Sequence, residues 1–371
     1  MKKINIYLVL AALAFISLFA AVGLSIGGGI AHAGPLFIAA FILTSIAFRG
    51  FEALKGFSYT LIIFAAVTTA LYYPQYFISV NGVKLSILIT PLIQIIMFGM
   101  GTSMGVEDFA GVLKMPKGVF IGVFSHFLIM PGLGFTLAKL SGFPPEIAAG
   151  IILIGCSPNG MASNVISYLA KANLALSITI TAVSTMLAPF FTPLLMKLLG
   201  GAFIKIDVLN MMWDIFKMVI IPIGAGILFN KYLLKKAKWL EVAMPIVSMA
   251  GIALIIVVIT AAGRASLLNI GAMLVLVVLV HNLLGYTLGY WAGRLFKMDE
   301  RDCRTMAIEV GMQNGGLASG LAKEMGKMAT VGLAPAVFGP LMNVTGSLLA
   351  TYWHRKPLGK KDAEMQEQAI T

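Results

Sequence analysis

The sequence predicts an all-α polytopic membrane protein, and three observations support this fold class. Hydrophobic residues make up 59% of the 371-residue chain, charged residues make up only 11%, and the mean hydropathy is +0.94. Apolar runs of about 18 residues or more, long enough to cross a bilayer as a helix, recur from one end of the chain to the other. The alternating apolar and polar pattern of a membrane β-barrel is missing.

These apolar runs predict twelve membrane spans joined by short polar loops, including one loop over residues 105–117. After the first run, Ala31-His32-Ala33 resembles a signal peptidase site, so a cleaved signal peptide remains the alternative for the first span. The spans are residues 4–26, 35–49, 57–74, 85–104, 118–140, 145–171, 173–200, 208–232, 239–262, 268–293, 302–324 and 328–352.

The formal net charge of +12 does not indicate a nucleic-acid-binding protein. The basic residues neither cluster on one face nor alternate with aromatic residues. Most of them fall in alternate loops, on the side where an even number of spans places both termini. Cytoplasmic loops of membrane proteins are rich in Lys and Arg, so we expect both termini in the cytoplasm. Cys156 and Cys303 have no metal-ligand spacing, and we expect them to be small apolar core residues.

An internal repeat follows the first two spans. Segment 134–142 resembles segment 285–293, and each precedes an acidic loop and a span with a break at Asn159–Ser163 or Asn314–Ser319. An odd number of spans separates the copies, so they insert with opposite orientation, as in inverted-repeat transporters. The predicted organisation is extra N-terminal hydrophobic segments (1–56), a first five-helix repeat (57–200), a second (201–353) and a polar tail (354–371).

The second break carries the most unusual residues of the chain. Glu309–Gly320 combines an acid, two amides and several glycines inside an apolar span. A carboxylate at membrane depth is costly without a partner, and an interrupted helix frees backbone polar groups that only protein or a cavity can satisfy. Ser177 and Thr181, four residues apart, place two hydroxyls on one helical face. Oxygen ligands for a hard cation such as sodium are thus expected from Ser163, Asn164, Ser177, Thr181, Glu309 and Gln313.

The same breaks also predict an anion site beside the cation site. Each break offers the N-terminus of a half-helix, at Gly160–Ser163 and at Gly315–Ser319, where unpaired N–H groups and the helix dipole favour negative charge. Coupled transport uses such neighbouring sites. Two simpler interpretations remain open. Asn159 and Asn314 could only cap the half-helices, and the hydroxyls of the preceding paragraph could only bond the carbonyls of their own helix.

Several motifs resemble the bile acid:sodium symporter (BASS) family, and the resemblance extends over about residues 57–355. The motifs are residues 97–101, 154–164, 168–177, 181–185, 309–314 and 346–353. The resemblance implies a ten-helix fold of two inverted five-helix repeats, with a core domain, a panel domain and two crossing discontinuous helices. The two N-terminal segments lie outside this pattern. It further implies a secondary transporter in a bacterial inner membrane, without enzymatic activity.

The resemblance also implies two sodium sites and a substrate site. The first sodium site would use Ser163, Asn164, Ser177, Thr181 and Glu309. The second would use Glu309, Gln313, and the backbone carbonyls of Val310 and Met312. An organic anion, bile-acid-like or pantoate-like, would bind at the breaks, near Asn159, Gly160, Met161, Asn314, Gly315 and Asn343. Sodium is the expected coupling ion, and no organic cofactor is expected. The expected partners are a small organic anion and the lipid bilayer, not nucleic acid, and a monomer is compatible with the sequence.

Two residues depart from the family pattern. His126 stands where the family usually has a Gln that binds the second sodium ion, and imidazole offers a protonatable nitrogen instead of an amide oxygen. The second site is therefore expected to be weaker, pH-sensitive or coupled to a proton. Met161 stands where bacterial relatives place a Thr, which favours a different or more apolar anion. Proton coupling is the main alternative mechanism. An intramembrane hydrolase using Ser319 and His281 is a remote one.

Overall fold

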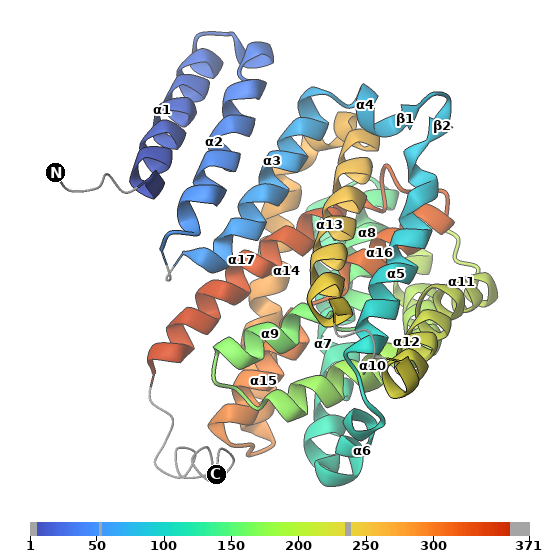
Figure 1. Ribbon diagram of the computed structural model, residues 1–371. Helices are drawn as coiled ribbons and strands as arrows, with labels where there is room; N and C mark the ends of the chain where they lie inside the picture. The colour runs from blue at the N-terminus through green and yellow to red at the C-terminus, as the bar shows by residue number, and fades with distance from the viewer. Residues whose placement is uncertain (1–5, 52–53, 234–238, 357–371) are drawn as a thin grey trace, which may run out of the picture.

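The computed structural model describes residues 6–51, 54–233 and 239–356, and these ranges fold almost entirely into helices (Figure 1). Within these ranges, eight helices are long and apolar enough to cross a bilayer, and three shorter apolar helices accompany them. The all-α polytopic fold class is therefore confirmed, and the protein is an integral membrane protein. The predicted tail from His354 onward is described only as far as Lys356.

The elements follow one another along the chain with short connections. The helices are α1 (Ile6–Ile26), α2 (Gly34–Phe48), α3 (Ser58–Tyr72), α4 (Gln75–Ile78), α5 (Ile89–Thr102), α6 (Val106–Lys114), α7 (Pro116–Ser141), α8 (Pro145–Cys156), α9 (Ala162–Leu169), α10 (Leu174–Leu199), α11 (Val208–Ile215), α12 (Ile221–Leu233), α13 (Trp239–Ala262), α14 (Arg264–Leu295), α15 (Glu300–Gly311), α16 (Gly315–Glu324) and α17 (Leu333–Arg355). The 3-10 turns are η1 (Ile30–His32), η2 (Lys55–Phe57), η3 (Leu85–Leu88) and η4 (Gly200–Ala202), the π-helical turn is η5 (Phe216–Ile220), and the two strands are β1 (Ser79–Val80) and β2 (Val83–Lys84).

The N-terminal helices form a hairpin at the edge of the molecule. Helix α1 packs against α2, and α2 packs against α3. The turn of the hairpin lies against the end of α3, because the Tyr72 ring covers Gly34 and the Tyr72 hydroxyl donates to Ile30 O at 3.0 Å. Ala33, in the possible signal peptidase site, is fully buried there. Most large side chains of α1 are exposed, as expected of a helix surrounded by lipid.

The remaining helices form two sets. In the first, α5 packs against α12 and α13, and α13 packs against α3; α11 continues into α12. We call this the panel set. In the second, the crossing set, α7 packs against α8, α10, α14 and α15, and α17 packs against α8, α9, α14 and α16. Each set takes helices from both predicted halves, residues 57–200 and 201–353, so the halves interleave.

Small residues allow the closest helix crossing of the panel set. A Cβ atom on Gly101 of α5 would lie 2.3 Å from Ile223 O, and one on Gly226 of α12 would lie 2.3 Å from Phe98 O. The two backbones therefore touch, and any larger side chain would separate the helices.

Both predicted helix breaks are present. Helix α8 ends at Cys156 and α9 begins at Ala162, while α15 ends at Gly311 and α16 begins at Gly315. Pro158 in the first break lacks the N–H that a continuous helix would need. The N-terminal ends of α9 and α16 therefore lie inside the crossing set instead of at the surface.

Three local features differ from the prediction. The region predicted as a loop over residues 105–117 contains helix α6, which packs against α7 and α10. A short hairpin, β1 and β2, follows the small helix α4 before α5. Helices α11 and α12 are joined by the π-helical turn η5, and Asp214 of α11 forms an ion pair with Lys217 of η5 at 2.9 Å. Both cysteines are free and buried, as predicted.

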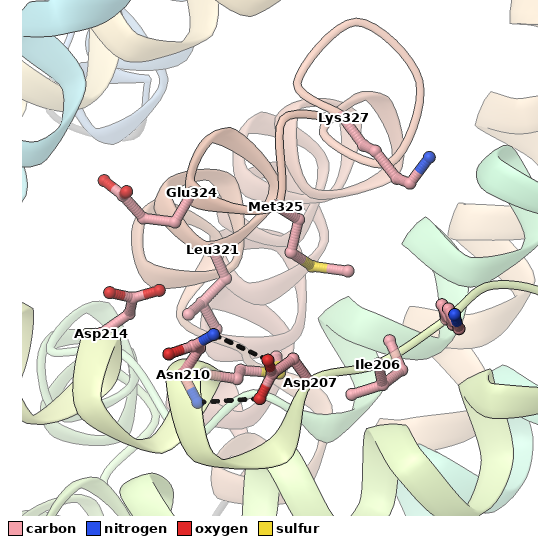
Figure 2. A pocket seen from close by; sticks show the side chains of 10 residues that line it. Ile206, Asp207, Asn210, Asp214, Leu321, Glu324, Met325 and Lys327 are labelled. Atoms are coloured by element: carbon pink, nitrogen blue, oxygen red, sulfur yellow. Dashed lines mark hydrogen bonds between the residues drawn. The ribbon is translucent and has the colours of Figure 1, made fainter.

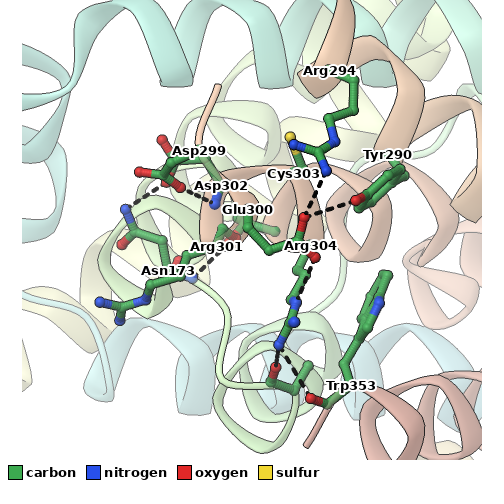
Figure 3. A network of polar contacts seen from close by, with 12 residues as sticks. Asn173, Tyr290, Arg294, Asp299, Glu300, Arg301, Asp302, Cys303, Arg304 and Trp353 are labelled. Atoms are coloured by element: carbon green, nitrogen blue, oxygen red, sulfur yellow. Dashed lines mark hydrogen bonds and ion pairs between the residues drawn. The ribbon is translucent and has the colours of Figure 1, made fainter. Parts of the chain in front are cut away.

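A buried arginine ties three helix ends together in the crossing set (Figure 3). Arg304 is 1% exposed, and its Nη1 donates to Ala170 O and Trp353 O, both at 3.2 Å, while its Nε pairs with Glu300 at 3.0 Å. Those carbonyls lie at the C-terminal ends of α9 and α17, where backbone acceptors have no partner in their own helix. Arg304 thus fixes α9 relative to α15, and both carry candidate site residues.

Candidate functional site

The two helix breaks cross at the centre of the crossing set. Asn314 N donates to Pro158 O at 2.8 Å, and a Cβ atom on Gly160 would lie 3.1 Å from Gln313 O. The side chain of Asn159 donates to Glu309 O through a short hydrogen bond. Residues that are about 150 positions apart in sequence therefore share one site, as the prediction of a common site at the two breaks required.

Glu309, on the last turn of α15, is fully buried and faces hydroxyls of α10. Its Oε1 accepts from Ser177 Oγ at 2.5 Å, and its Oε2 accepts from Thr181 Oγ1 at 2.9 Å. Ser177 and Thr181 donate to the Glu309 carboxylate, so the simpler interpretation, in which these hydroxyls only bond carbonyls of their own helix, is wrong. None of the ion pairs in the described part of the chain includes Glu309.

Helix α9 supplies the remaining oxygens around this carboxylate. Asn164 Oδ1 lies 2.9 Å from Ser177 Oγ and 3.3 Å from Thr181 Oγ1, and Ser163 Oγ lies 3.2 Å from Thr181 Oγ1. Ser167 Oγ lies 3.0 Å from Ser177 Oγ and was not predicted. Its position three residues after Asn164, on the same face of α9, was the signal that could have identified it.

This oxygen cluster has more acceptors than protons to share. Ser177 has one hydroxyl proton, yet its Oγ lies within hydrogen-bond distance of three other oxygens. The cluster combines one full negative charge with amide and hydroxyl oxygens, and lacks a cationic side chain. That donor set suits a hard cation such as sodium. Across the described residues, no group of three or more His, Cys, Asp or Glu side chains gathers as a transition metal would require.

A second group of oxygens lies on the other side of Glu309, at the crossing point. Gln313 Oε1 and Asn159 Oδ1 are buried and, among the described residues, accept no hydrogen bond. A buried acceptor without a partner costs free energy, so both oxygens fit a ligand that supplies positive charge. Gln313 Nε2 donates to Val310 O at 2.9 Å, which uses one of the two carbonyls expected at the second sodium site. Met312, which carries the other, is fully buried.

His126 joins the two breaks through its ring. Its Nδ1 lies 3.0 Å from Glu309 O, and its Nε2 lies 2.8 Å from Ser157 O, on a fully buried side chain of α7. A neutral imidazole has one N–H and donates only one of these hydrogen bonds. His126 therefore adjoins the expected second sodium site, but both of its nitrogens face backbone oxygens.

The two half-helix N-termini differ in how they are capped. Asn314 Oδ1 accepts from Leu317 N at 3.0 Å, so Asn314 caps α16, as one of the simpler interpretations required. Asn159 caps nothing and instead bonds Glu309 O. Helix α9 starts after Met161 without a side-chain cap, and Ser163 N and Asn164 N donate within the first turn, to Gly160 O at 3.0 Å and to Met161 O at 3.2 Å. Gly315 N already donates to Gln313 O at 3.2 Å.

A cavity of about 190 Å³ lies between the two sets and reaches the oxygen cluster. Among the predicted site residues, Met161, Asn164 and Thr181 line this cavity. The sequence interpretation missed its other lining residues, which are Met100, Ser103, Met104, Val165 and Ile178. The resemblance motif at residues 97–101 was the only sequence feature that pointed to this lining. The lining is largely apolar and has no charged side chain.

Two predicted residues contact other parts of the crossing set. Asn343 Nδ2 donates to Gly339 O of its own helix at 3.0 Å, and its neighbour Met342 contacts Gln313 N. His281 Nε2 lies 3.0 Å from Met130 O. Within the described residues, no hydrogen bond joins His281 to Ser319, so the dyad that a hydrolase would need is not formed.

Comparison with known proteins places this architecture in a family. Residues 90–270 match the model of the sodium bile acid symporter family. The uncharacterized sodium-dependent transporter YocS of Bacillus subtilis is 40% identical over 280 residues, which cover 75% of this chain and 86% of that protein. The probable sodium/metabolite cotransporter BASS1 of Arabidopsis thaliana is 35% identical over 71% of this chain and 66% of that protein. BASS6 of the same plant, also a probable sodium/metabolite cotransporter, is 32% identical over 80% of this chain and 74% of that protein.

These relatives are named as transporters and not as enzymes. The chain belongs to the sodium bile acid symporter family, a family of sodium-dependent transporters.

Proposed function

We propose that this protein is a symporter that uses a sodium gradient to move a small organic anion across the membrane by alternating access. The observation that carries the proposal is the environment of Glu309. A fully buried carboxylate surrounded by hydroxyl and amide oxygens, with no ion-pair partner among the described residues, fits a site whose missing charge is a bound cation. Ser163, Asn164, Ser177 and Thr181 complete this first sodium site.

A second sodium site is proposed at the crossing point. Gln313 Oε1 and Asn159 Oδ1 are buried acceptors without a partner among the described residues, which supports cation binding there. Glu309 would contribute to both sites, together with the backbone carbonyls of Val310 and Met312. His126 holds the two breaks beside this site, and we propose that it modifies the affinity of the second sodium ion.

The substrate is proposed to bind between the breaks and the cavity beside Met161. The uncapped start of α9 favours the carboxylate of an anion. Gly160, Gly315 and the amides Asn159, Asn314 and Asn343 lie at or near the crossing. The cavity of about 190 Å³ is smaller than the roughly 300–1,000 Å³ of sites for drug-sized ligands. This size favours a compact, pantoate-like acid over a steroid bile acid.

The proposal includes the arrangement in the membrane. Two inverted five-helix repeats would lie over residues 57–200 and 201–353. The first would contain α3, α5, α7, α8 with α9, and α10, and the second would contain α11 with α12, α13, α14, α15 with α16, and α17; the short helices α4 and α6 are not counted. The loops rich in Lys and Arg support cytoplasmic termini and a bacterial inner membrane. A monomer would suffice, because the proposed ion and substrate ligands all come from one chain.

Uptake into proteoliposomes tests the proposal. The protein is given an inward sodium gradient, or a potassium gradient as control, and radiolabelled pantoate, short keto acids or taurocholate. We expect uptake of a small acid with sodium only, and none in the Glu309→Ala variant. Uptake that follows a pH gradient alone would replace sodium by a proton. Normal sodium-driven uptake by Glu309→Ala would refute the assigned site.

A further inference from the structure

A polar contact joins the two sets of helices at the start of α5. Thr90 Oγ1 donates to Glu324 Oε1 at 2.6 Å, and Lys323 Nζ lies 3.1 Å from Thr90 Oγ1 and 2.8 Å from Glu324 Oε1. Thr90 belongs to the panel set, whereas Lys323 and Glu324 form the end of α16 in the crossing set. We call these three residues the Thr90–Glu324 contact.

An apolar layer lies one helical turn beneath this contact. Ile93 of α5 and Met218 of η5 are buried, and both approach Gly320 of α16. A Cβ atom on Gly320 would lie 2.2 Å from Ile93 Cδ1 and 3.3 Å from Met218 Sδ. No space for water or a solute remains at this point. The passage between the two sets is therefore closed at two levels, one polar and one apolar.

The molecule is hollowed just beside the contact (Figure 2). A crevice of about 220 Å³ lies between α16 and the segment that leads into and includes α11. Glu324 belongs both to this crevice and to the Thr90–Glu324 contact. The polar lining residues are Lys205, Asp207, Asn210, Asp214, Glu324 and Lys327.

The opposite end of α5 is arranged differently. Met100, Ser103 and Met104 line the cavity of about 190 Å³ that reaches Asn164 and Thr181 of the oxygen cluster. Met100 is 10 residues after Thr90 in α5, which corresponds to about 15 Å along the helix. The interface between the two sets thus has a cavity that reaches the proposed ion site at one end and is closed at the other.

We propose that the Thr90–Glu324 contact is a gate that closes the path to the proposed ion site from the face at which α5 begins. The inference rests on the proposed function, since a carrier must open each face in turn. Separation of the two sets at this face requires that the hydrogen bonds of Thr90 with Glu324 and Lys323 break first, whereas the Lys323–Glu324 ion pair lies within α16 and can persist. The buried layer of Ile93, Gly320 and Met218 then becomes accessible to solvent.

Cysteine labelling measures this opening directly. The natural cysteines Cys156 and Cys303 are buried, so a Met218→Cys reporter is expected to react over a low background. An anionic, membrane-impermeant maleimide is added to intact cells and, separately, to inverted membrane vesicles. From the face that carries Thr90, Glu324→Gln and Thr90→Val are each expected to raise the labelling rate about threefold to tenfold.

Two controls isolate the contact itself. Asp214→Asn removes a negative charge from the same crevice, but the ion pair of Asp214 is with Lys217 of η5, within the panel set. The labelling rate of this variant should stay that of the parent. Thr90→Ser keeps the hydroxyl and should also keep the parent rate. Equal labelling of the parent, Glu324→Gln and Thr90→Val variants, or an equal increase with Asp214→Asn, would overturn the proposal.

The labelling assay needs neither sodium nor substrate. A failure of sodium-driven uptake would therefore refute the proposed symport without changing the labelling result. Unaltered labelling in the variants, with sodium-driven uptake intact, would refute only the gate.

Discussion

Replacing Glu309 by Gln gives the most direct test of the oxygen cluster. The amide has the shape of the carboxylate but removes the only full charge of the cluster, while Ser177 and Thr181 keep one oxygen to bond. Removing one partner of a buried, hydrogen-bonded charge pair costs about 2–5 kcal/mol. At about 1.4 kcal/mol per factor of ten, the sodium Kd should rise between about 30-fold and several thousandfold.

The assay is the thermal unfolding of detergent-purified protein with sodium or with potassium. At a sodium concentration of 100 times its Kd, the parent protein gains about 2.7 kcal/mol of stability, because sodium binds only the folded state. With the Kd raised at least 30-fold, Glu309→Gln should gain less than about 0.9 kcal/mol at the same concentration. Potassium should leave the melting temperature of both proteins unchanged.

A second prediction for Glu309→Gln concerns its stability without sodium, which should be higher than that of the parent. In sodium-free buffer the buried carboxylate has no compensating positive charge, so its removal should raise the melting temperature of the variant above that of the parent. Asp214→Asn, which neutralises an acid of the crevice beside α11, is the charge-matched control and should keep the full sodium response. A full sodium response in Glu309→Gln would refute the assignment of the cluster as a sodium site.

Three further substitutions test separate parts of the structure. Arg304→Gln should lower the free energy of unfolding by about 3 kcal/mol in denaturant titrations, because it removes the buried donor shared by the carbonyls of Ala170 and Trp353 at two helix ends. Arg294→Gln, at a 47% exposed side chain, should cost under about 1 kcal/mol, and equal losses would contradict this argument. Met161→Thr should raise the preference for a hydroxylated acid over its deoxy analogue about tenfold in competition uptake, whereas the lipid-facing Met273→Thr should not. His126→Gln should steepen the dependence of uptake on sodium concentration, and an unchanged slope would exclude His126 from the second site.

Local sequence features were sufficient to predict the helices and the two breaks. Long apolar runs have few stable solutions in a bilayer, so they predict helices with little ambiguity. Pro158 and the glycines after Asn314 interrupt those runs, and Glu309 is an acid where an acid is costly. Helix α6 was missed, because its nine residues are too short and too polar to stand out from a loop.

The fold class, the position of the breaks and the residues with unusual chemistry were thus predictable, because each depends on a residue and its near neighbours. Which of these residues contact one another was visible only in the folded molecule. Ser177 and Glu309 are 132 positions apart, and Thr90 and Glu324 are 234 apart. The contacts of Ser167, of the methionines in the cavity and of both nitrogens of the His126 ring also join residues that are distant in the sequence. Such pairs depend on how whole helices cross, and helix crossings are set by the packing of many small side chains together rather than by any local pattern.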